Sequence, residues 1–214
     1  MKHLKFLVAL WKANLQAALE FRSAFLTQVI FMMVNNGAYF MFWVLYFDKF
    51  KAVQGWTLQD MMLLYGIAAT AWGTAAYFFG SFIISGYLTA DGALRFAFAV
   101  FTGVCMFISF LTIIQSLSFW LGNTVALSQI ALSALLTFSL YPSALFNAST
   151  KFVLLTIIPA ALIGSVPAEF VRSFTWQSLS QISAGALIFV FLAVTIFRSG
   201  LRRYESGSAI QVEV

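Results

Sequence analysis

The segment Ser139–Phe170, SLYPSALFNASTKFVLLTIIPAALIGSVPAEF, contains all three prolines of the chain: Pro142, Pro159 and Pro167. It lies within an otherwise almost continuous apolar sequence. Proline lacks a backbone N–H and interrupts helices, and hydrocarbon offers no replacement hydrogen-bond partner. Irregular backbone is tolerated at membrane depth only where protein or a water-filled cavity covers it. The segment therefore predicts a re-entrant pair of short helices that neighbouring helices shield.

Two further features of this segment argue against a straight crossing. Residues 151–166 number only 16, whereas a straight transmembrane helix needs about 20 residues. Pro159 and Gly164 also interrupt this stretch. The hydroxyl of Ser149 or Thr150 is placed to cap the first short helix. We expect a gate on the outer side of the membrane that includes Tyr141, Pro142, Pro159 and Pro167.

The composition of the whole chain is that of an integral membrane protein. Of the 214 residues, 62% are hydrophobic and only 9% are charged, whereas soluble domains carry about 25% charged residues. Spans of about 20 residues leave no room for a soluble domain. The predicted fold class is all-α. We expect an N-terminal interfacial helix, five to six transmembrane helices and a re-entrant helical hairpin before the last span.

The number of spans conflicts with the charges at the two ends. Apolar spans begin near residues 23, 58, 96, 125 and 178. Basic residues precede the first span and follow the last, namely Lys2, Lys5, Lys12 and Arg22, then Arg198, Arg202 and Arg203. Because basic residues mark the cytoplasmic side, both termini are expected there, which requires an even number of crossings. Either the proline segment supplies a sixth crossing, or part of the arrangement is irregular.

The N-terminal 22 residues differ from the spans that follow them. Their apolar side chains recur every three or four positions, with Lys2, Lys5 and Lys12 beside them. This pattern is typical of an amphipathic helix that lies in the membrane interface. Residues 1–22 are therefore assigned to an interfacial helix, residues 23–208 to the transmembrane domain and residues 209–214 to a C-terminal tail.

Two sets of residues within the first two spans are candidates for helix contacts or a transport pathway. Gln28, Asn35 and Asn36 interrupt the first span, and such amides face other helices or a pathway rather than lipid. In the second span, small residues recur every three or four positions and allow a second helix to approach closely. This predicted packing seam, which also suits a pathway lining, consists of Gly66, Ala69, Gly73, Ala76 and Gly80.

Several kinds of chemistry are missing from the sequence. It contains no phosphate-binding G-x-x-x-x-G-K-[ST] loop. Its one histidine is His3, its one cysteine is Cys105, and no acidic residue falls at the middle of a span. These features argue against a metal site, a proton relay and an intramembrane enzyme. The net charge of +5 is explained by basic residues at the ends of spans, so no nucleic-acid partner is expected.

Several segments together resemble a known family. They are the interfacial N-terminus, FWLGN at Phe119–Asn123, the YP…IIPAALI…P pattern between Phe138 and Pro167, and GLRRYESGS at Gly200–Ser208. These segments are similar to those of ABC-2 type permeases. The closest resemblance is to the small bacterial branch whose members pair with a separate ATPase.

This resemblance implies a function and a set of partners. A second permease chain, identical or a sister subunit, completes the membrane channel in the bacterial cytoplasmic membrane, in contact with membrane lipids. Separate ATPase subunits bind ATP and Mg, so this chain holds no cofactor and catalyses no reaction itself. Family members usually export amphiphilic or hydrophobic substrates. A coupling helix in the first cytoplasmic loop transmits the motion of the ATPase.

The sequence departs from the family at that loop, TADGALR (Thr89–Arg95). Gly92 and Leu94 match the start of the family's G-x-L-D motif, but Arg95 replaces the acid. A coupling segment and one helix, about 40 residues at the usual span length, are missing between Leu94 and Arg95. Either this segment is deleted, or the proline segment crosses the membrane fully. The remnant of the coupling loop, or an ordinary turn, consists of Asp91, Gly92, Leu94 and Arg95.

The C-terminal tail and the function of the whole chain each have two interpretations. The tail residues are expected to contact either the ATPase or lipid headgroups: Arg202, Arg203 and Tyr204. The leading function is that of a permease subunit. The alternative is a scaffold or assembly subunit that transports nothing, or a degenerate permease whose coupling loop is lost.

Overall fold

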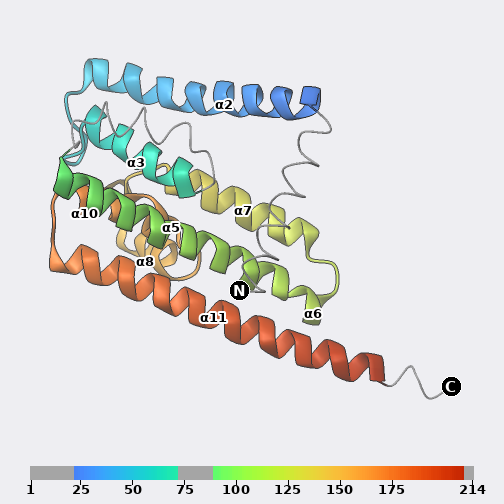
Figure 1. Ribbon diagram of the computed structural model, residues 1–214. Helices are drawn as coiled ribbons and strands as arrows, with labels where there is room; N and C mark the ends of the chain where they lie inside the picture. Colours follow the sequence, from blue (N-terminus) through green and yellow to red (C-terminus); the bar gives the residue numbers. More distant parts are fainter. Residues whose placement is uncertain (1–21, 72–88, 210–214) are drawn as a thin grey trace. The chain divides into compact units, whose positions relative to one another are not determined.

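The computed structural model describes residues 22–71 and 89–209, and all helices and strands named below lie within them (Figure 1). The described chain is all-α, as expected, apart from one isolated bridge between Val53 and Trp56. Its elements are α2 (Arg22–Lys49), α3 (Leu58–Ala71), α5 (Ala90–Ser116), α6 (Ser118–Leu121), α7 (Val125–Ser139), the 3-10 helix η1 (Ser143–Leu145), α8 (Ala148–Thr156), α9 (Ala160–Ile163), α10 (Ser165–Arg172) and α11 (Trp176–Ala209). The expected interfacial helix at residues 1–22 lies outside the described residues, except for Arg22.

The chain divides into two compact units, residues 1–51 and residues 52–214. In the first unit, α2 is one helix of 28 residues that covers the expected first span. At its C-terminal end a series of aromatic rings pack against one another, from Phe42 to Phe50, in edge-on, stacked and tilted pairs. All other described elements belong to the second unit.

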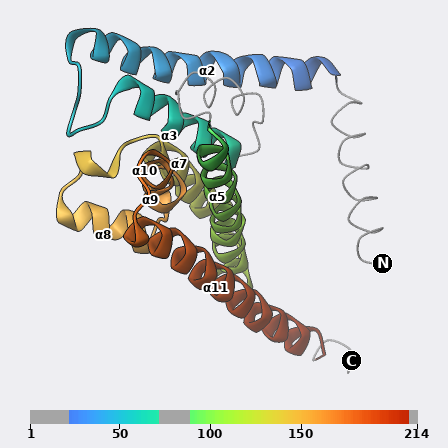
Figure 2. The same cartoon turned by 60° about the vertical axis from the view of Figure 1, so that its left-hand side comes forward.

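The second unit is built around α5 and α11, which form its most extensive helix pair. The two helices run in the same direction, while α7 runs back along α5 (Figures 1 and 2). The buried face of α5 has the helical spacing of three and four, at Phe96, Ala99, Gly103, Met106 and Phe110. On α11, Gly185 lies directly under the side chains of Leu162 and Met106. Small residues at this point let α5, α9 and α11 meet.

The described residues contain fewer membrane spans than the sequence suggested. Ala90–Leu121 and Trp176–Arg203 are long and apolar enough to cross a membrane. The bent pair Ala148–Thr156 and Ala160–Arg172 makes a third if it counts as one span. These are two or three of the five to six spans expected. The expected second span continues past Ala71 into residues that are not described, and α7 has only 15 residues.

Helix α5 begins earlier than the sequence suggested, and it runs through Leu94 and Arg95 without a break. The predicted loop at Thr89–Arg95 is therefore wrong as a conformation. Thr89 is the N-cap of α5, and its hydroxyl oxygen accepts a hydrogen bond from the Gly92 amide at 3.0 Å. Asp91 in the first turn adds a negative charge where the helix dipole favours one. A threonine N-cap and a nearby acid start a helix, so polar residues here mark its beginning and not a loop.

Candidate functional site

The proline segment forms short broken helices, as predicted. Helix α8 and the α9–α10 pair bend by 70° at the break between Thr156 and Ala160. This bend fits a re-entrant pair and also a broken span, the two alternatives left by the crossing count. All four residues of α9 are buried, as are most of those of α10. Other protein segments therefore cover the irregular backbone, as hydrocarbon surroundings require.

Each proline occupies a position that needs no backbone donor. Pro142 precedes η1, Pro159 precedes α9, and Pro167 lies in the first turn of α10, where helical N–H groups have no partner within the helix. All three side chains are fully buried. One detail of the prediction is wrong: the cap of α8 is Asn147, whose side-chain oxygen accepts from the Thr150 amide at 2.9 Å. Asparagine caps helices at least as well as serine or threonine.

Helix α9 and the end of α7 approach each other at Gly164. A Cβ atom on Gly164 would lie 2.0 Å from the backbone oxygen of Ser139. Ser139 itself is fully buried, and its hydroxyl donates to the Leu136 oxygen at 3.0 Å. Only glycine fits at this contact, because the opposing atom belongs to a backbone that cannot rotate away.

A small polar cluster lies at the turn between α7 and α10. The Ser143 amide donates to the hydroxyl oxygen of buried Ser165 at 2.9 Å. Both serine hydroxyls lie at the edge of hydrogen-bond range from the Glu169 carboxylate, Ser165 at 3.4 Å and Ser143 at 3.5 Å. The cluster ties η1 to the first turn of α10. Among the described residues, no group of three or more His, Cys, Asp and Glu side chains is placed to hold a metal.

Arg172, the last residue of α10, joins this segment to the start of α3. Its guanidinium donates to the Gly55 oxygen at 3.0 Å and to the carboxylate of Asp60 at 3.1 Å. It also lies 5.5 Å from the centre of the Trp56 ring, within range of a cation–π contact. Asp60 additionally accepts from the amide and the hydroxyl of Thr57. The sequence offered no signal for this pairing, since 112 residues separate its members.

The predicted coupling residues lie at the beginning of α5, next to the beginning of α11. Arg95 pairs with Asp91 one turn earlier, and its guanidinium lies 5.3 Å from the centre of the Phe174 ring. Phe174 lies two residues before α11 and contacts Phe170 of α10. The other two predicted residues differ in exposure, because Gly92 is buried and Leu94 is 73% exposed.

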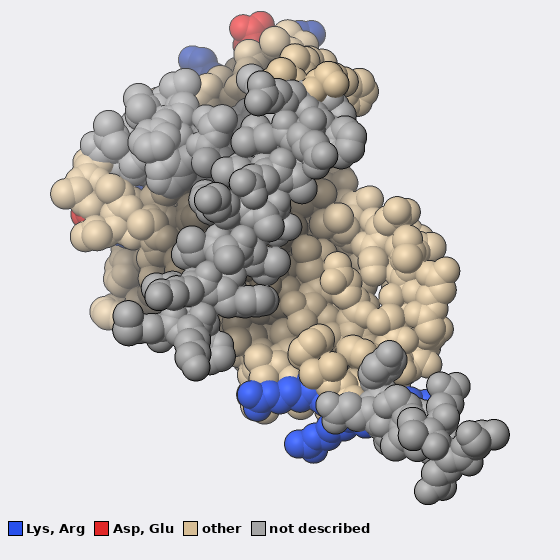
Figure 3. Space-filling model, turned by 45° about the vertical axis from the view of Figure 1, so that its right-hand side comes forward, with Lys and Arg blue, Asp and Glu red and all other residues tan. Residues whose placement is uncertain are grey.

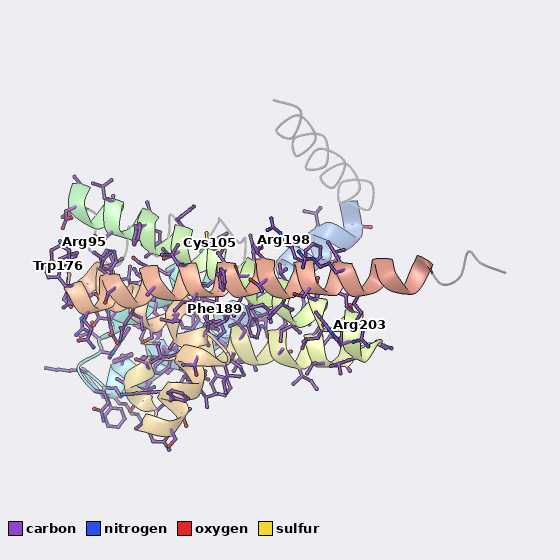
Figure 4. The ribbon with its side chains drawn as sticks, turned by 90° about the horizontal axis from the view of Figure 1, so that it is seen from below. Arg95, Cys105, Trp176, Phe189, Arg198 and Arg203 are labelled. Carbon is purple, nitrogen blue, oxygen red and sulfur yellow. The ribbon has the colours of Figure 1, made fainter. Side chains whose placement is uncertain are left out.

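The predicted tail residues lie at the opposite end of α11. Figure 4 shows Arg95 and Trp176 at one end of the helix pair, and Arg198 and Arg203 toward the other. At that end, Phe119 of α6 packs against Phe197 and Gly200. The predicted coupling residues and the predicted tail residues therefore lie at opposite ends of the α5–α11 pair.

The remaining predicted residues within the described ranges lie on three different helices and do not form one site. Gln28, Asn35 and Asn36 lie on α2 in the first unit, where Asn35 is exposed. Of the packing seam, Gly66 is buried on α3 and Ala69 lies on the same helix. Gly73, Ala76 and Gly80 lie outside the described residues. On α11, Arg202 and Arg203 are exposed and Tyr204 follows them.

The sequence profile of ABC-2 family transporter proteins matches residues 79–208, more than half of the chain. The chain belongs to the ABC-2 family. This ABC-2 protein is therefore an integral membrane protein with apolar helices, and it is not catalytic itself. In the family ATP binds to the ATPase, so an ATPase partner is implied. No curated protein and no solved structure matches the chain.

Proposed function

We propose that this chain is the permease subunit of an ABC transporter that exports an amphiphilic or hydrophobic substrate. The observation that carries the proposal is the family match over residues 79–208, in a sequence that has no ATP-binding loop of its own. A separate ATPase supplies the energy, and a second permease chain, identical or a sister subunit, completes the pathway. Exposed apolar side chains on α11, such as Leu187, Ile188 and Phe191, suit contact with lipid or with that second chain.

The charges of the second unit support one orientation. At the Arg172 end, acids and bases are paired, Asp60 with Arg172 and Asp91 with Arg95. At the other end, the charged side chains of α11 that the structure describes are all basic: Arg198, Arg202 and Arg203. Figure 3 shows Lys and Arg side chains near this end of the molecule from one side. Because an excess of basic residues marks the cytoplasmic side, we place the C-terminal end of α11 in the cytoplasm and the Arg172 end outside.

This orientation bears on two of the predictions. The bent helices α8 to α10 then lie toward the outer side, which supports the re-entrant gate with Tyr141, Pro142, Pro159 and Pro167. The beginning of α5 also lies outside, so we do not retain the coupling role for Asp91, Gly92, Leu94 and Arg95. Helices α3 and α5 both begin at this outer end. The deletion between Leu94 and Arg95 stays a prediction.

Labelling of single cysteines tests the orientation. Cys105 is the only cysteine, so Cys105→Ala gives a background for Leu94→Cys and Arg202→Cys, both at exposed positions. In intact cells with a permeable outer membrane, a charged maleimide is expected to label Leu94→Cys but not Arg202→Cys. Disruption of the inner membrane should expose Arg202→Cys to the reagent. The reverse pattern contradicts the orientation, and labelling of both from one side contradicts the placement of α5 and α11.

With this orientation, we propose that the ATPase contacts the turn between α5 and α7. Helix α6 lies there, beside the end of α11. Leu121 is 65% exposed and Trp120 is 38% exposed, and Gly122 has a φ of 75°, which favours glycine and ends α6 sharply. Large exposed apolar side chains at the cytoplasmic end suit a protein partner.

A double variant tests this contact. Trp120→Ala with Leu121→Ala is expected to lower co-purification of the ATPase, and the ATPase activity that substrate stimulates, by at least about tenfold, since interface aromatics often contribute 2 kcal/mol or more. Phe152→Ala with Ile157→Ala is the control, because these exposed apolar residues lie on α8 and its end. Equal losses in both variants would contradict a specific contact at α6.

Reconstitution distinguishes a permease subunit from a scaffold that transports nothing. The chain is purified in nanodiscs together with a candidate ABC ATPase. If the chain is a permease, it binds this ATPase, changes its turnover, and moves a fluorescent amphiphile across vesicle membranes when ATP is added. If the chain binds no ATPase and does not change the rate of ATP hydrolysis, the transport proposal fails and a scaffold role is supported.

A further inference from the structure

An apolar groove of about 320 Å³ runs between α5 and α11. Small side chains form its floor, since Ser109 and Ala193 are each only 5% exposed. Larger and more exposed side chains form its walls, among them Ile108, Val194 and Phe197. Small residues on the two packed helices leave this hollow between them.

The walls of this groove offer little to a polar ligand. The Ser109 hydroxyl donates to the Cys105 backbone oxygen at 2.6 Å, and the Thr112 hydroxyl donates to the Ile108 oxygen at 2.8 Å. Both hydroxyls are thus satisfied within α5 and turn their methylene and methyl groups to the groove. The occupant that fits is an extended hydrocarbon chain.

The groove leads toward a basic side chain. Val190, Val194 and Arg198 follow one another at intervals of four residues on α11, so they form one row along the helix. Figure 4 shows Arg198 on the same side of α11 as Cys105, while Arg203 lies on another side. An acyl chain in the groove therefore ends beside Arg198 and not beside Arg203.

Arg198 also lies at the depth of the lipid headgroups. The 20 residues of α11 from Ser178 to Phe197 extend about 30 Å as a helix, which matches the hydrocarbon core. The exposed Arg198 follows directly, where a guanidinium pairs with phosphate. Arg198 is thus a cation one helical turn beyond Val194, which lines the apolar groove.

We propose that this groove is a binding site for an anionic phospholipid, with one acyl chain between α5 and α11 and the phosphate on Arg198. A second copy of the chain fits this position less well. A parallel pair related by two-fold symmetry brings the same basic helix ends together, and like charges repel. An anionic headgroup supplies the complementary charge. The lipid site does not depend on transport activity.

Native mass spectrometry of the full chain tests the site. The protein is solubilised from vesicles of equal phosphatidylglycerol and phosphatidylcholine, and bound lipids are counted. Wild type is expected to retain phosphatidylglycerol in preference to phosphatidylcholine. Arg198→Gln should lower the retained phosphatidylglycerol about fivefold, the effect of one basic residue at a membrane surface. Arg203→Gln is the matched control, and it should change retention little.

A second change fills the groove after the protein has folded. Cys105 lines the groove and is the only cysteine, so N-benzylmaleimide places a bulky group there. Alkylation should lower retention of both lipids, and Cys105→Ala treated with the same reagent should retain them. An unchanged elution volume shows that the fold is intact.

Three outcomes would overturn the lipid site. Equal losses from Arg198→Gln and Arg203→Gln indicate general charge attraction. Unchanged lipid retention after full alkylation of Cys105 places the acyl chain elsewhere. Dissociation of a dimer on alkylation, with lipid retention unchanged, makes a second copy of the chain the occupant of the groove.

Discussion

Gly164→Ala is expected to destabilise the protein by about 3 kcal/mol, because the added methyl group meets backbone that cannot move aside. A Cβ at Gly164 lies 2.0 Å from the Ser139 oxygen and 3.0 Å from the Ser139 carbonyl carbon. To accept alanine, α9 has to separate from the end of α7, where both segments are buried. The measurement is the melting temperature in detergent, which should fall by about 6–12 °C.

Gly37→Ala is the matched control for this variant. A Cβ at Gly37 meets nothing within 4 Å, and alanine is favoured over glycine in a helix by about 1 kcal/mol. Its melting temperature should therefore stay the same or rise. Equal melting temperatures for Gly164→Ala and wild type would contradict the close contact between α9 and α7.

Arg172→Ala is expected to lower the free energy of unfolding by about 3 kcal/mol, because it leaves the Asp60 carboxylate buried without its ion-pair partner. The Asp60 side chain is 6% exposed, whereas that of Arg172 is 33% exposed, so we expect the low end of the range for buried pairs. The variant also loses the hydrogen bond to the Gly55 oxygen and the contact with Trp56. Because Arg172 joins α10 to the start of α3, the loss should appear as a lower melting temperature in detergent.

Three companion variants separate the charge from the geometry. Arg172→Lys keeps the charge but lacks the planar guanidinium that reaches two acceptors. Its loss of stability should therefore lie between zero and that of Arg172→Ala. Asp60→Asn combined with Arg172→Ala should cost less than the sum of the two single changes. This double-mutant cycle should give a coupling free energy of at least about 1 kcal/mol between the two side chains, as is usual for residues in contact. Additive losses would contradict a direct interaction between the two side chains.

The sequence predicted the proline segment well because the constraint there is local. Proline fixes its own backbone and removes a donor, and this holds in any fold. The segment between α7 and α11 therefore had to break into short helices. The residue that caps α8 is Asn147 and not Ser149 or Thr150. Its identity depends on where the chain turns after Phe146, which rules about proline do not predict.

The beginning of α5 shows how a local pattern can mislead. The polar residues from Thr89 to Arg95 resemble a loop in a chain this apolar, but in the structure they cap and start a helix. Helix caps and polar loops use the same residue types. What distinguishes them here is the neighbour: Phe174 lies over Arg95, a contact between residues far apart in the sequence.

The sequence by itself determined the helical class, the membrane setting, the broken segment at the prolines and the resemblance to ABC-2 permeases. Composition, residue spacing and the missing donor of proline act within about 20 residues, so they can be read without coordinates. Only the tertiary structure decided that α5 and α11 run in the same direction, that Arg172 pairs with Asp60, and that the predicted coupling residues and tail lie at opposite ends. These depend on which helices pack together, and packing is set by surfaces distributed over the whole chain.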